Sequence, residues 1–160
     1  MGRPIVELDV TDPSVAADVA RVSRSAYLVE ASLVGREDFP PVHRTGEDIS
    51  KSTARFFGLF ADGELAAIVE LDTGGPDEVD IHSLVTDPRF FRQGMAREVL
   101  QYVLDLAPDR AFVVATSTAN RVAIALYTSL GFRERRRWTT TDGFHFISLV
   151  RSADQPGYST

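Results

Sequence analysis

Hydrophobic residues recur along this chain with two different periods, which separate the expected helices from the expected strands. From Pro13 to about Val34 they return every three to four positions, which is the spacing of one helical face. Thr11 or Asp12 can cap that helix, because both side chains accept hydrogen bonds and Pro13 suits a first helical position. Elsewhere, short runs rich in valine, isoleucine and phenylalanine stand between glycine, proline or aspartate residues, which is typical of strands.

The same patterns predict the remaining elements. The expected strands are residues 4–9, 56–61, 64–71, 79–85, 111–116, 132–139 and 144–151. The expected helices after the first are residues 47–54, residues 93–106 and one that begins at Ala119. Asp62-Gly63 favours a tight hairpin, and the strand 111–116 runs parallel to 79–85 if the helix between them is a standard crossover. We therefore expect an α/β fold with a mixed sheet and helices on both faces.

Composition restricts the class of protein. The 160 residues suit one domain, which we place at residues 1–152, followed by a tail at 153–160 that we expect to be disordered. A hydrophobic content of 44% and a charged content of 25% are typical of soluble globular proteins. No apolar run approaches the ~20 residues that span a bilayer, and no basic-then-apolar leader opens the chain. We therefore expect a cytoplasmic protein that does not associate with membranes.

Cysteine content and charge exclude further classes. The chain has no cysteine, which rules out disulfides, thiolate metal sites and a cysteine nucleophile, and we predict no metal site. The net charge of −6 argues against a nucleic-acid partner. The basic run 133–137 is expected to place alternate arginines, Arg133, Arg135 and Arg137, on a solvated strand face. Acidic residues gather around a predicted hairpin at 70–80 and either form a solvated tip or attract a cationic amine; they are Glu70, Asp72, Asp77, Glu78 and Asp80.

The segment from Leu84 to Ala96 has the pattern of an anion site. It reads as a buried strand that ends near Val85, a turn, and a helix that opens at Gly94, with Arg92 just before it. A helix N-terminus presents unpaired N–H groups and a positive dipole end. Glycine lets an anion approach the backbone and permits unusual φ angles. The segment indicates a phosphate or pyrophosphate site, although an ordinary connector between a strand and a helix has the same pattern.

A second motif follows about thirty residues later, in NRVAIALYTSLGF. On a helix, Asn120 and Tyr127 are two turns apart and share a face, with the small Ala123 between them. Gly131 suits a helix C-terminus, and Phe132 begins the next strand. By itself, this motif also fits a plain amphipathic helix whose tyrosine packs in the core.

As an ordered pair, the two motifs resemble the GNAT superfamily of acyl-CoA-dependent N-acyltransferases over roughly residues 55–150. That family's cofactor motif is usually Gln/Arg-x-x-Gly-x-Gly/Ala, and here its last four positions match, with Gly94 and Ala96 in place. Phe91 stands where glutamine or arginine is usual, and Arg92 follows it. The second motif matches the family's Asn…Tyr…Gly-Phe pattern without a gap. The resemblance implies a mostly antiparallel sheet with one splayed pair of parallel strands.

The resemblance also implies an activity and a set of site residues. An acetyl group would pass from acetyl-CoA, the co-substrate, to a primary amine by direct attack in a ternary complex. The pantetheine arm would enter where the strands ending near Val85 and Thr116 separate, and it would pair with the backbone of Leu84 and Val85. Asn120 would bind the arm from the other side, and Tyr127 would contact the cofactor and protonate the leaving thiolate. The pyrophosphate would be held by Arg92, Gln93, Gly94, Met95 and Ala96.

The general base is less well defined by the sequence. A lysine-type amine is neutral in roughly one of 2,500 molecules at pH 7, at a cost of about 4.6 kcal/mol, so a base is useful. Some family members carry a glutamate five residues before the motif asparagine, where this chain has Ala115. His82 is the first candidate because it titrates near neutral pH and precedes Val85, and Glu70 is the second. Both residues also have ordinary structural interpretations, and no Ser83 triad can be assembled from the three histidines.

The resemblance places the acceptor site in residues 27–50 and 138–145, where the aromatic, acidic and imidazole side chains are Tyr27, Glu30, Phe39, His43 and Trp138. The acceptor is a small-molecule or peptide amine, and a homodimer is compatible with the family. Two alternatives stay open. One is a non-catalytic acyl-CoA-binding or interaction module on the same fold. The other is a nucleotide-binding α/β protein, which is disfavoured because neither Gly-x-x-x-x-Gly-Lys-Ser/Thr nor an early Gly-x-Gly-x-x-Gly is present.

Overall fold

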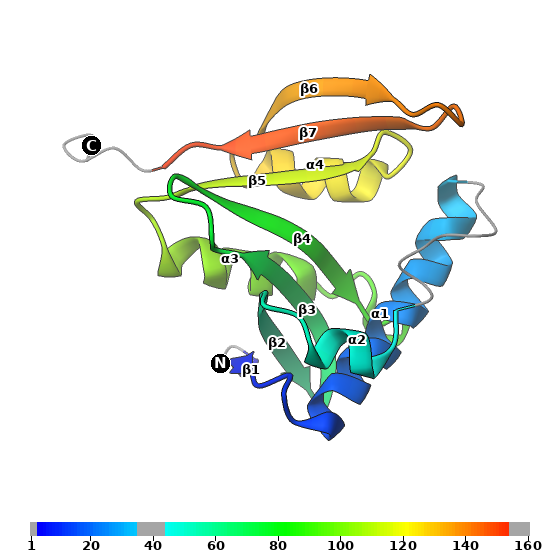
Figure 1. The fold of residues 1–160 in the computed structure, drawn as a ribbon, viewed down its shortest axis with the longest axis vertical. Coiled ribbons are helices and arrows are strands. Elements are labelled where there is room, and N and C mark those ends of the chain that lie inside the picture. Colours follow the sequence, from blue (N-terminus) through cyan, green and yellow to red (C-terminus); the bar gives the residue numbers. More distant parts are fainter. Residues whose placement is uncertain (1–2, 35–43, 154–160) are drawn as a thin grey trace.

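The sheet of this protein has seven strands in the order β1-β2-β3-β4-β5-β7-β6 (Figure 1). The computed structural model describes residues 3–34 and 44–153. The strands are β1 Ile5–Leu8, β2 Arg55–Ala61, β3 Glu64–Asp72, β4 Glu78–Thr86, β5 Ala111–Ser117, β6 Arg133–Thr139 and β7 His145–Arg151. Only β4 and β5 run parallel among these neighbours. The predicted mixed, mostly antiparallel sheet with one parallel pair is confirmed.

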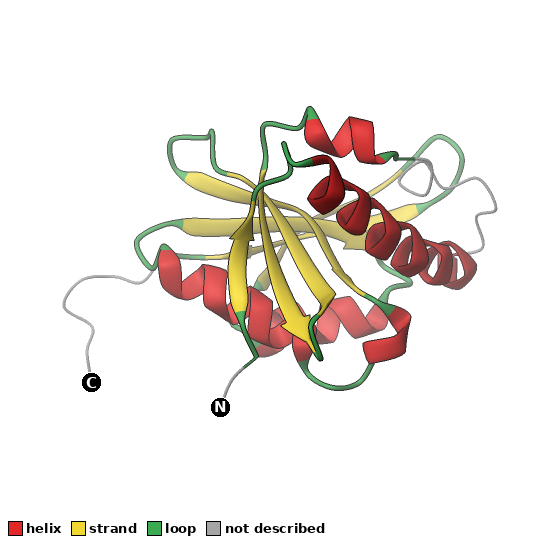
Figure 2. Cartoon of the chain, turned by 90° about the horizontal axis from the view of Figure 1, so that it is seen from below, coloured by secondary structure: helices red, strands yellow, loops and turns green. Residues whose placement is uncertain are grey.

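Helices cover both faces of the sheet, as Figure 2 shows. They are α1 Pro13–Val34, α2 Gly46–Ser50, the short 3-10 helix η2 Pro88–Phe90, α3 Met95–Leu106 and α4 Arg121–Ser129. One core cluster joins α1 and α2 to the sheet, and a second joins α3 and α4 to the opposite face. None of these described helices combines the length and apolar character that crossing a bilayer requires.

Local chemistry explains where several elements begin and end. The Asp12 carboxylate accepts a hydrogen bond from the Ser14 amide at 2.9 Å, so Asp12 provides the predicted cap of α1. Thr45 and Asp48 form a capping box at the start of α2. That helix ends at Ser50 and not at the predicted residue 54, because the amide of Ser52 bonds back to Ile49 in a tighter turn.

The hairpin between β2 and β3 has the predicted turn. Asp62 and Gly63 both have positive φ angles, of 53° and 77°. This left-handed pair matches the twist of the flanking strands, which is why an Asp-Gly sequence favours it. The sequence alone therefore located this connection correctly.

The parallel strands β4 and β5 separate part-way along their length. They pair only from Glu78 to Ile81 on β4 and from Ala111 to Val114 on β5. Beyond these residues β4 stays paired with β3, and β5 stays paired with β7. Each strand thus keeps one backbone edge without a partner strand, and the two edges face a common opening. The splay implied by the family resemblance is present.

The predicted alternation along β6 is wrong. The register with β7 shifts between Glu134 and Arg136, so Arg135 is an extra residue, and every position from Arg133 to Arg137 is exposed. A bulge of this kind breaks the two-residue period from which the solvated face was predicted. Two of the arginines are in ion pairs, Arg135 with Glu78 at 2.9 Å and Arg137 with Glu134 at 2.8 Å.

Candidate active site

A cavity of about 560 Å³ lies beside the end of β4, where it has parted from β5. Four segments line it: the second half of α1, the end of β4, the turn leading into α3, and the first turns of α4. The residues predicted for the cofactor meet here with one exception, and those in the lining are Leu84, Val85, Arg92, Gly94, Met95, Ala96, Asn120 and Tyr127. The two sequence motifs therefore belong to one site.

The N-terminus of α3 is open toward the cavity. Gly94 is its N-cap with a φ of 76°, and no side chain caps the helix there. A Cβ at Gly94 would meet nothing within 4 Å, so the backbone at this point is open. Arg92 also adopts a left-handed φ, of 64°, and its side chain pairs with no group in the described chain. The amides of the first turn and this free cation fit a pyrophosphate.

Two details of this segment differ from the prediction. Gln93 is not in the cavity lining; its carbonyl accepts a hydrogen bond from Arg3 at 3.3 Å. Phe91 does line the cavity and is 40% exposed. In the sequence, Phe91 is interpreted only as a departure from the family motif. The signal for a site residue is a large apolar side chain that stands next to a predicted anion site and outside any predicted core position.

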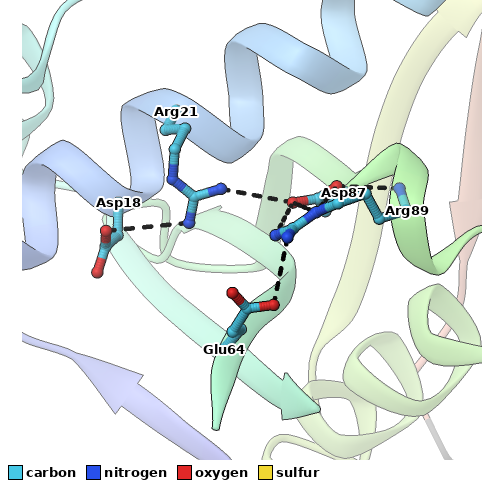
Figure 3. A network of polar contacts seen from close by, with 5 residues as sticks. All are labelled: Asp18, Arg21, Glu64, Asp87 and Arg89. Carbon is cyan, nitrogen blue, oxygen red and sulfur yellow. Dashed lines mark hydrogen bonds and ion pairs between the residues drawn. The ribbon is translucent and has the colours of Figure 1, made fainter. Parts of the chain in front are cut away.

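A polar network holds the turn between β4 and α3 (Figure 3). Asp87 is only 3% exposed, and its carboxylate accepts hydrogen bonds from the Arg89 amide and guanidinium, both at 3.0 Å. Arg21 on α1 reaches the same carboxylate at 3.5 Å and pairs with Asp18 at 3.9 Å. Arg89 extends to Glu64 on β3 at 3.3 Å. The network therefore ties the turn between β4 and α3 to α1 and to β3.

Asp87→Asn should lower the free energy of unfolding by about 1–3 kcal/mol at pH 7. Each kcal/mol lost should lower the Tm by roughly 2–4 °C. Arg89 holds the pKa of the Asp87 carboxyl below its ordinary value. Because the folded-state pKa is the lower one, this stabilisation is complete above the unfolded value of about 3.9 and is lost as the pH falls further. Thermal melts at pH 7, 5 and 3.5 should show the wild-type advantage shrinking only in the most acidic sample.

The matched control for this prediction is Asp18→Asn, at the exposed end of the same network, where we expect a change within about 0.5 kcal/mol. Equal losses for Asp18→Asn and Asp87→Asn at pH 7 would contradict the assignment of the stabilisation to the buried carboxylate.

Tyr127 presents its hydroxyl to the cavity. The residue is 3% exposed, and its ring lies edge-on against Phe132 with centroids 5.2 Å apart. The Tyr127 hydroxyl makes no hydrogen bond within the described residues. Among those residues, every fully buried polar atom of a side chain has a hydrogen-bond partner. The hydroxyl is therefore not fully buried, and it is accessible from the cavity that Tyr127 lines. Burial raises the pKa of Tyr127, and the nearby charges of Tyr27 and Glu30 raise it further, so the group keeps its proton at neutral pH.

Asn120 connects α4 to α1. It is the N-cap of α4, and its side-chain oxygen accepts a hydrogen bond from the Ala123 amide at 3.2 Å. The Asn120 side chain also lowers the pKa of the Glu30 carboxyl on α1. The helix therefore begins after Asn120, and not at Ala119 as predicted. Capping uses the side-chain oxygen of Asn120, so its NH₂ is the group that it can offer to the cavity.

Next to the cavity, a second set of polar groups is satisfied internally. Arg44 binds both carboxylate oxygens of Glu70, at 2.7 and 3.0 Å, and Glu70 is 4% exposed. Tyr27 donates to Ser83 at 2.7 Å, and burial raises the pKa of Tyr27 to about 12. Glu70 is thus not part of a solvated hairpin tip, which corrects that expectation. A carboxylate whose two oxygens both accept hydrogen bonds from an arginine is poorly placed to take a proton.

The structure separates His82 from this cavity. The His82 side chain is 48% exposed, and its Nε2 lies 3.8 Å from the Asp72 carboxylate on the neighbouring strand. The ligand atoms of His82, Asp72 and Asp80 lie within 4.8 Å of one another, all three residues being exposed. Of the three predicted catalytic residues, only Tyr127 lines the cavity.

The predicted acceptor region is only partly represented in the cavity. Glu30 lines it, whereas Trp138 stacks on Phe146 at 5.7 Å and lies under Arg136 at 4.5 Å. Phe39, His43 and residues 154–160 of the predicted tail lie outside the described residues. The apolar lining from α1 and α4, which includes Val29, was not anticipated, because nothing in a single helix reveals which face meets another helix.

Comparison with known families decides the relationship. Residues 23–132, more than half of the chain, match the family model described as Acetyltransferase (GNAT) family. The chain belongs to the GNAT family. Membership agrees with the order of the two motifs, the splayed strands and the open helix N-terminus described above, and it removes the nucleotide-binding alternative.

Two related sequences show how far the likeness extends along the chain. UPF0157 protein YqkA of Bacillus subtilis is 30% identical over 124 residues, which are 77% of this chain and 36% of that protein. The chain therefore spans only about a third of the length of YqkA. N-alpha-acetyltransferase RimI of Mycobacterium tuberculosis is 27% identical over 154 residues, which are 91% of this chain and 97% of that protein.

Two solved GNAT structures share the fold. The ribosomal-protein-S18-alanine N-acetyltransferase from Escherichia coli has a TM-score of 0.68 at 24% identity and covers 99% of both chains. The acetyltransferase yncA from Salmonella typhimurium, solved with acetyl-CoA, has a TM-score of 0.72 at 12% identity, covering 100% of this chain and 99% of that one. At these identities the likeness shows the GNAT fold and does not identify the acceptor substrate of this protein.

Proposed function

We propose that this GNAT protein transfers an acetyl group from acetyl-CoA to the α-amine of a peptide or protein. The observation that carries the proposal is one cavity in which an uncapped helix N-terminus, Arg92, the free edge of β4 and the Tyr127 hydroxyl come together. These are an anion site, an extended backbone edge and a proton donor. A pantetheine thioester with a pyrophosphate at its far end needs these three features.

Each group would have a distinct task. The amides after Gly94 and the Arg92 cation would hold the pyrophosphate, and the unpaired backbone of Leu84 and Val85 would align the arm. When bound, acetyl-CoA supplies the activated acyl group. Tyr127 would hold a proton at its hydroxyl oxygen for the leaving sulfur, since a thiolate with a pKa near 8.5 accepts a proton from a positioned phenol.

The choice of an α-amine is favoured by energetics as well as by relatives. An α-amine has a pKa of about 7.7–8.0, so making it neutral at pH 7 costs only about 1–1.4 kcal/mol, against about 4.6 for a lysine side chain. No histidine is among the described residues that line the cavity. The printed names of the relatives, N-alpha-acetyltransferase and S18-alanine N-acetyltransferase, point to the same acceptor class.

The test begins with thermal melting in the presence of acetyl-CoA, with ATP and NAD as controls. Saturation at 100 times Kd adds about 2.7 kcal/mol, which should raise the Tm by roughly 5–10 °C. CoA release is then measured with a hexapeptide that begins with alanine, and with a blocked hexapeptide that contains one lysine. We expect turnover of the first peptide to exceed that of the second by at least tenfold. Acetyl-CoA binding without turnover of either peptide would favour the non-catalytic binding module instead.

A further inference from the structure

Glu30 occupies a distinctive position in the cavity. It is the only carboxylate among the described residues that line it. Its backbone belongs to α1, on the opposite face of the sheet from α4, yet Glu30 lines the same cavity as Asn120 and Tyr127 of the α4 segment. The Asn120 side chain lowers the pKa of the Glu30 carboxyl, and the Glu30 charge contributes to the raised pKa of Tyr127, which agrees with this placement.

We propose that Glu30 is the catalytic residue that accepts the proton of the acceptor ammonium. This assignment rests on the proposed function and deepens it, because it names the group that prepares the amine. A carboxylate can accept several hydrogen bonds, so that of Glu30 has capacity for an N–H of the acceptor. Burial raises the pKa of the Glu30 carboxyl, and the Asn120 side chain opposes that rise. The net rise makes this carboxylate a stronger base than a solvated glutamate.

The charged and titratable groups that face Glu30 support one direction of proton movement. Tyr127 approaches from α4 and Tyr27 lies one turn away on α1, and both carry raised pKa values, so neither competes for the ammonium proton. The cations that line the same cavity are Arg92 and Arg97, and both belong to the anion-binding segment at α3. Glu30 is therefore the group that a cationic acceptor would find.

The proton count closes. The N–H bond of the ammonium breaks, its proton bonds to Glu30, and the electron pair stays on nitrogen. That pair forms the new C–N bond, the C–S bond breaks, and the sulfur takes the proton held by Tyr127. The second proton leaving nitrogen then restores the Tyr127 hydroxyl, and Glu30 releases its proton to solvent. The net products are an amide, a thiol and one proton.

The test compares wild type with Glu30→Gln, which keeps the size of the side chain and one carbonyl oxygen but accepts no proton. With the alanine-headed hexapeptide, we expect kcat/KM to fall by roughly 10- to 20-fold at pH 6.5, because only about 5% of such an α-amine is then neutral. At pH 9 the two proteins should agree within about twofold, since most of the amine is neutral without help. Glu7→Gln on β1, outside the cavity, should match wild type at both pH values.

Two further measurements separate catalysis from structure. Calorimetric titration with CoA should give Glu30→Gln a Kd within about twofold of wild type, because the pyrophosphate site lies on other residues. A ¹³C titration of the glutamate carboxyls should show one resonance with a pKa above the ordinary value of about 4.3, absent from Glu30→Gln and present in Glu7→Gln. Glu30→Asp, which keeps a carboxylate, should retain the wild-type shape of the pH profile at a lower rate even if Glu30→Gln folds poorly.

The outcomes are distinguishable. A loss of the same size at pH 6.5 and 9, a wild-type rate for Glu30→Gln at pH 6.5, or the absence of the raised carboxyl resonance would overturn the role of Glu30 and leave the proposed function standing. A wild-type protein that binds CoA but acetylates neither hexapeptide would overturn both.

Discussion

Tyr127→Phe is expected to lower kcat for peptide acetylation by about 10²–10³-fold at neutral pH, the usual worth of a positioned general acid. Tyr127 lines the cavity, burial keeps its hydroxyl protonated, and in the proposed function this hydroxyl is the proton donor. Removing it leaves the thiolate to depart without a proton. Phenylalanine keeps the ring and its edge-on contact with Phe132, so the Kd for CoA and the melting temperature should stay close to wild type.

The matched control for this variant is Tyr102→Phe. Tyr102 is on α3, where its ring packs 6.2 Å from that of Phe57 and does not line the cavity. Tyr102→Phe removes a tyrosine hydroxyl outside the cavity, so steady-state CoA release should be unchanged. If Tyr127→Phe kept more than about a third of the wild-type kcat while binding CoA normally, sulfur would be leaving without help from this residue, and the assignment would be wrong.

Ala96→Glu should weaken CoA binding by roughly 10- to 150-fold, which corresponds to the loss of about 1.5–3 kcal/mol of charge-assisted hydrogen bonding. Ala96 lies in the first turn of α3 and lines the cavity. A carboxylate at this position would accept from the first-turn amides and repel the pyrophosphate. The same carboxylate interacts favourably with the helix dipole and adds about 0.3–1 kcal/mol to the free energy of unfolding. Without CoA, the variant should therefore be at least as stable as wild type.

Ala96→Gln is the isosteric neutral control, and it separates charge from bulk. Titration calorimetry with CoA at low and high salt should show a small loss for glutamine and a large, partly salt-screened loss for glutamate. Equal losses for both variants would mean that the side chain blocks the cavity by size alone, and that the N-terminus of α3 does not hold the pyrophosphate.

Local sequence carried much of the fold because its signals act within a few residues. Asp62-Gly63 specifies its own turn, Asp12 caps the helix that begins at Pro13, and Gly94 accepts a left-handed conformation that opens a helix N-terminus. Each is decided by backbone sterics or by a hydrogen bond to a near neighbour. The parallel pairing of β5 with β4 was predicted from the helix that connects them, because such a crossover allows few alternatives.

Only the tertiary structure decided the contacts between segments that lie far apart in the chain. Glu70 was predicted as a solvated carboxylate or a base, but Arg44 engages both of its oxygens. His82 was predicted near the reaction, but its side chain is exposed beside Asp72 and does not line the cavity.

Glu30 shows the limit most clearly, because its place in one cavity with Asn120 and Tyr127 depends on how α1 is positioned relative to α4, which packs on the other face of the sheet. By itself the sequence determined the elements, the turn chemistry and the two cofactor motifs. The packing of α1 over the splayed strands decided which carboxylate enters the cavity, since side-chain direction depends on the summed contacts of elements that no local pattern encodes.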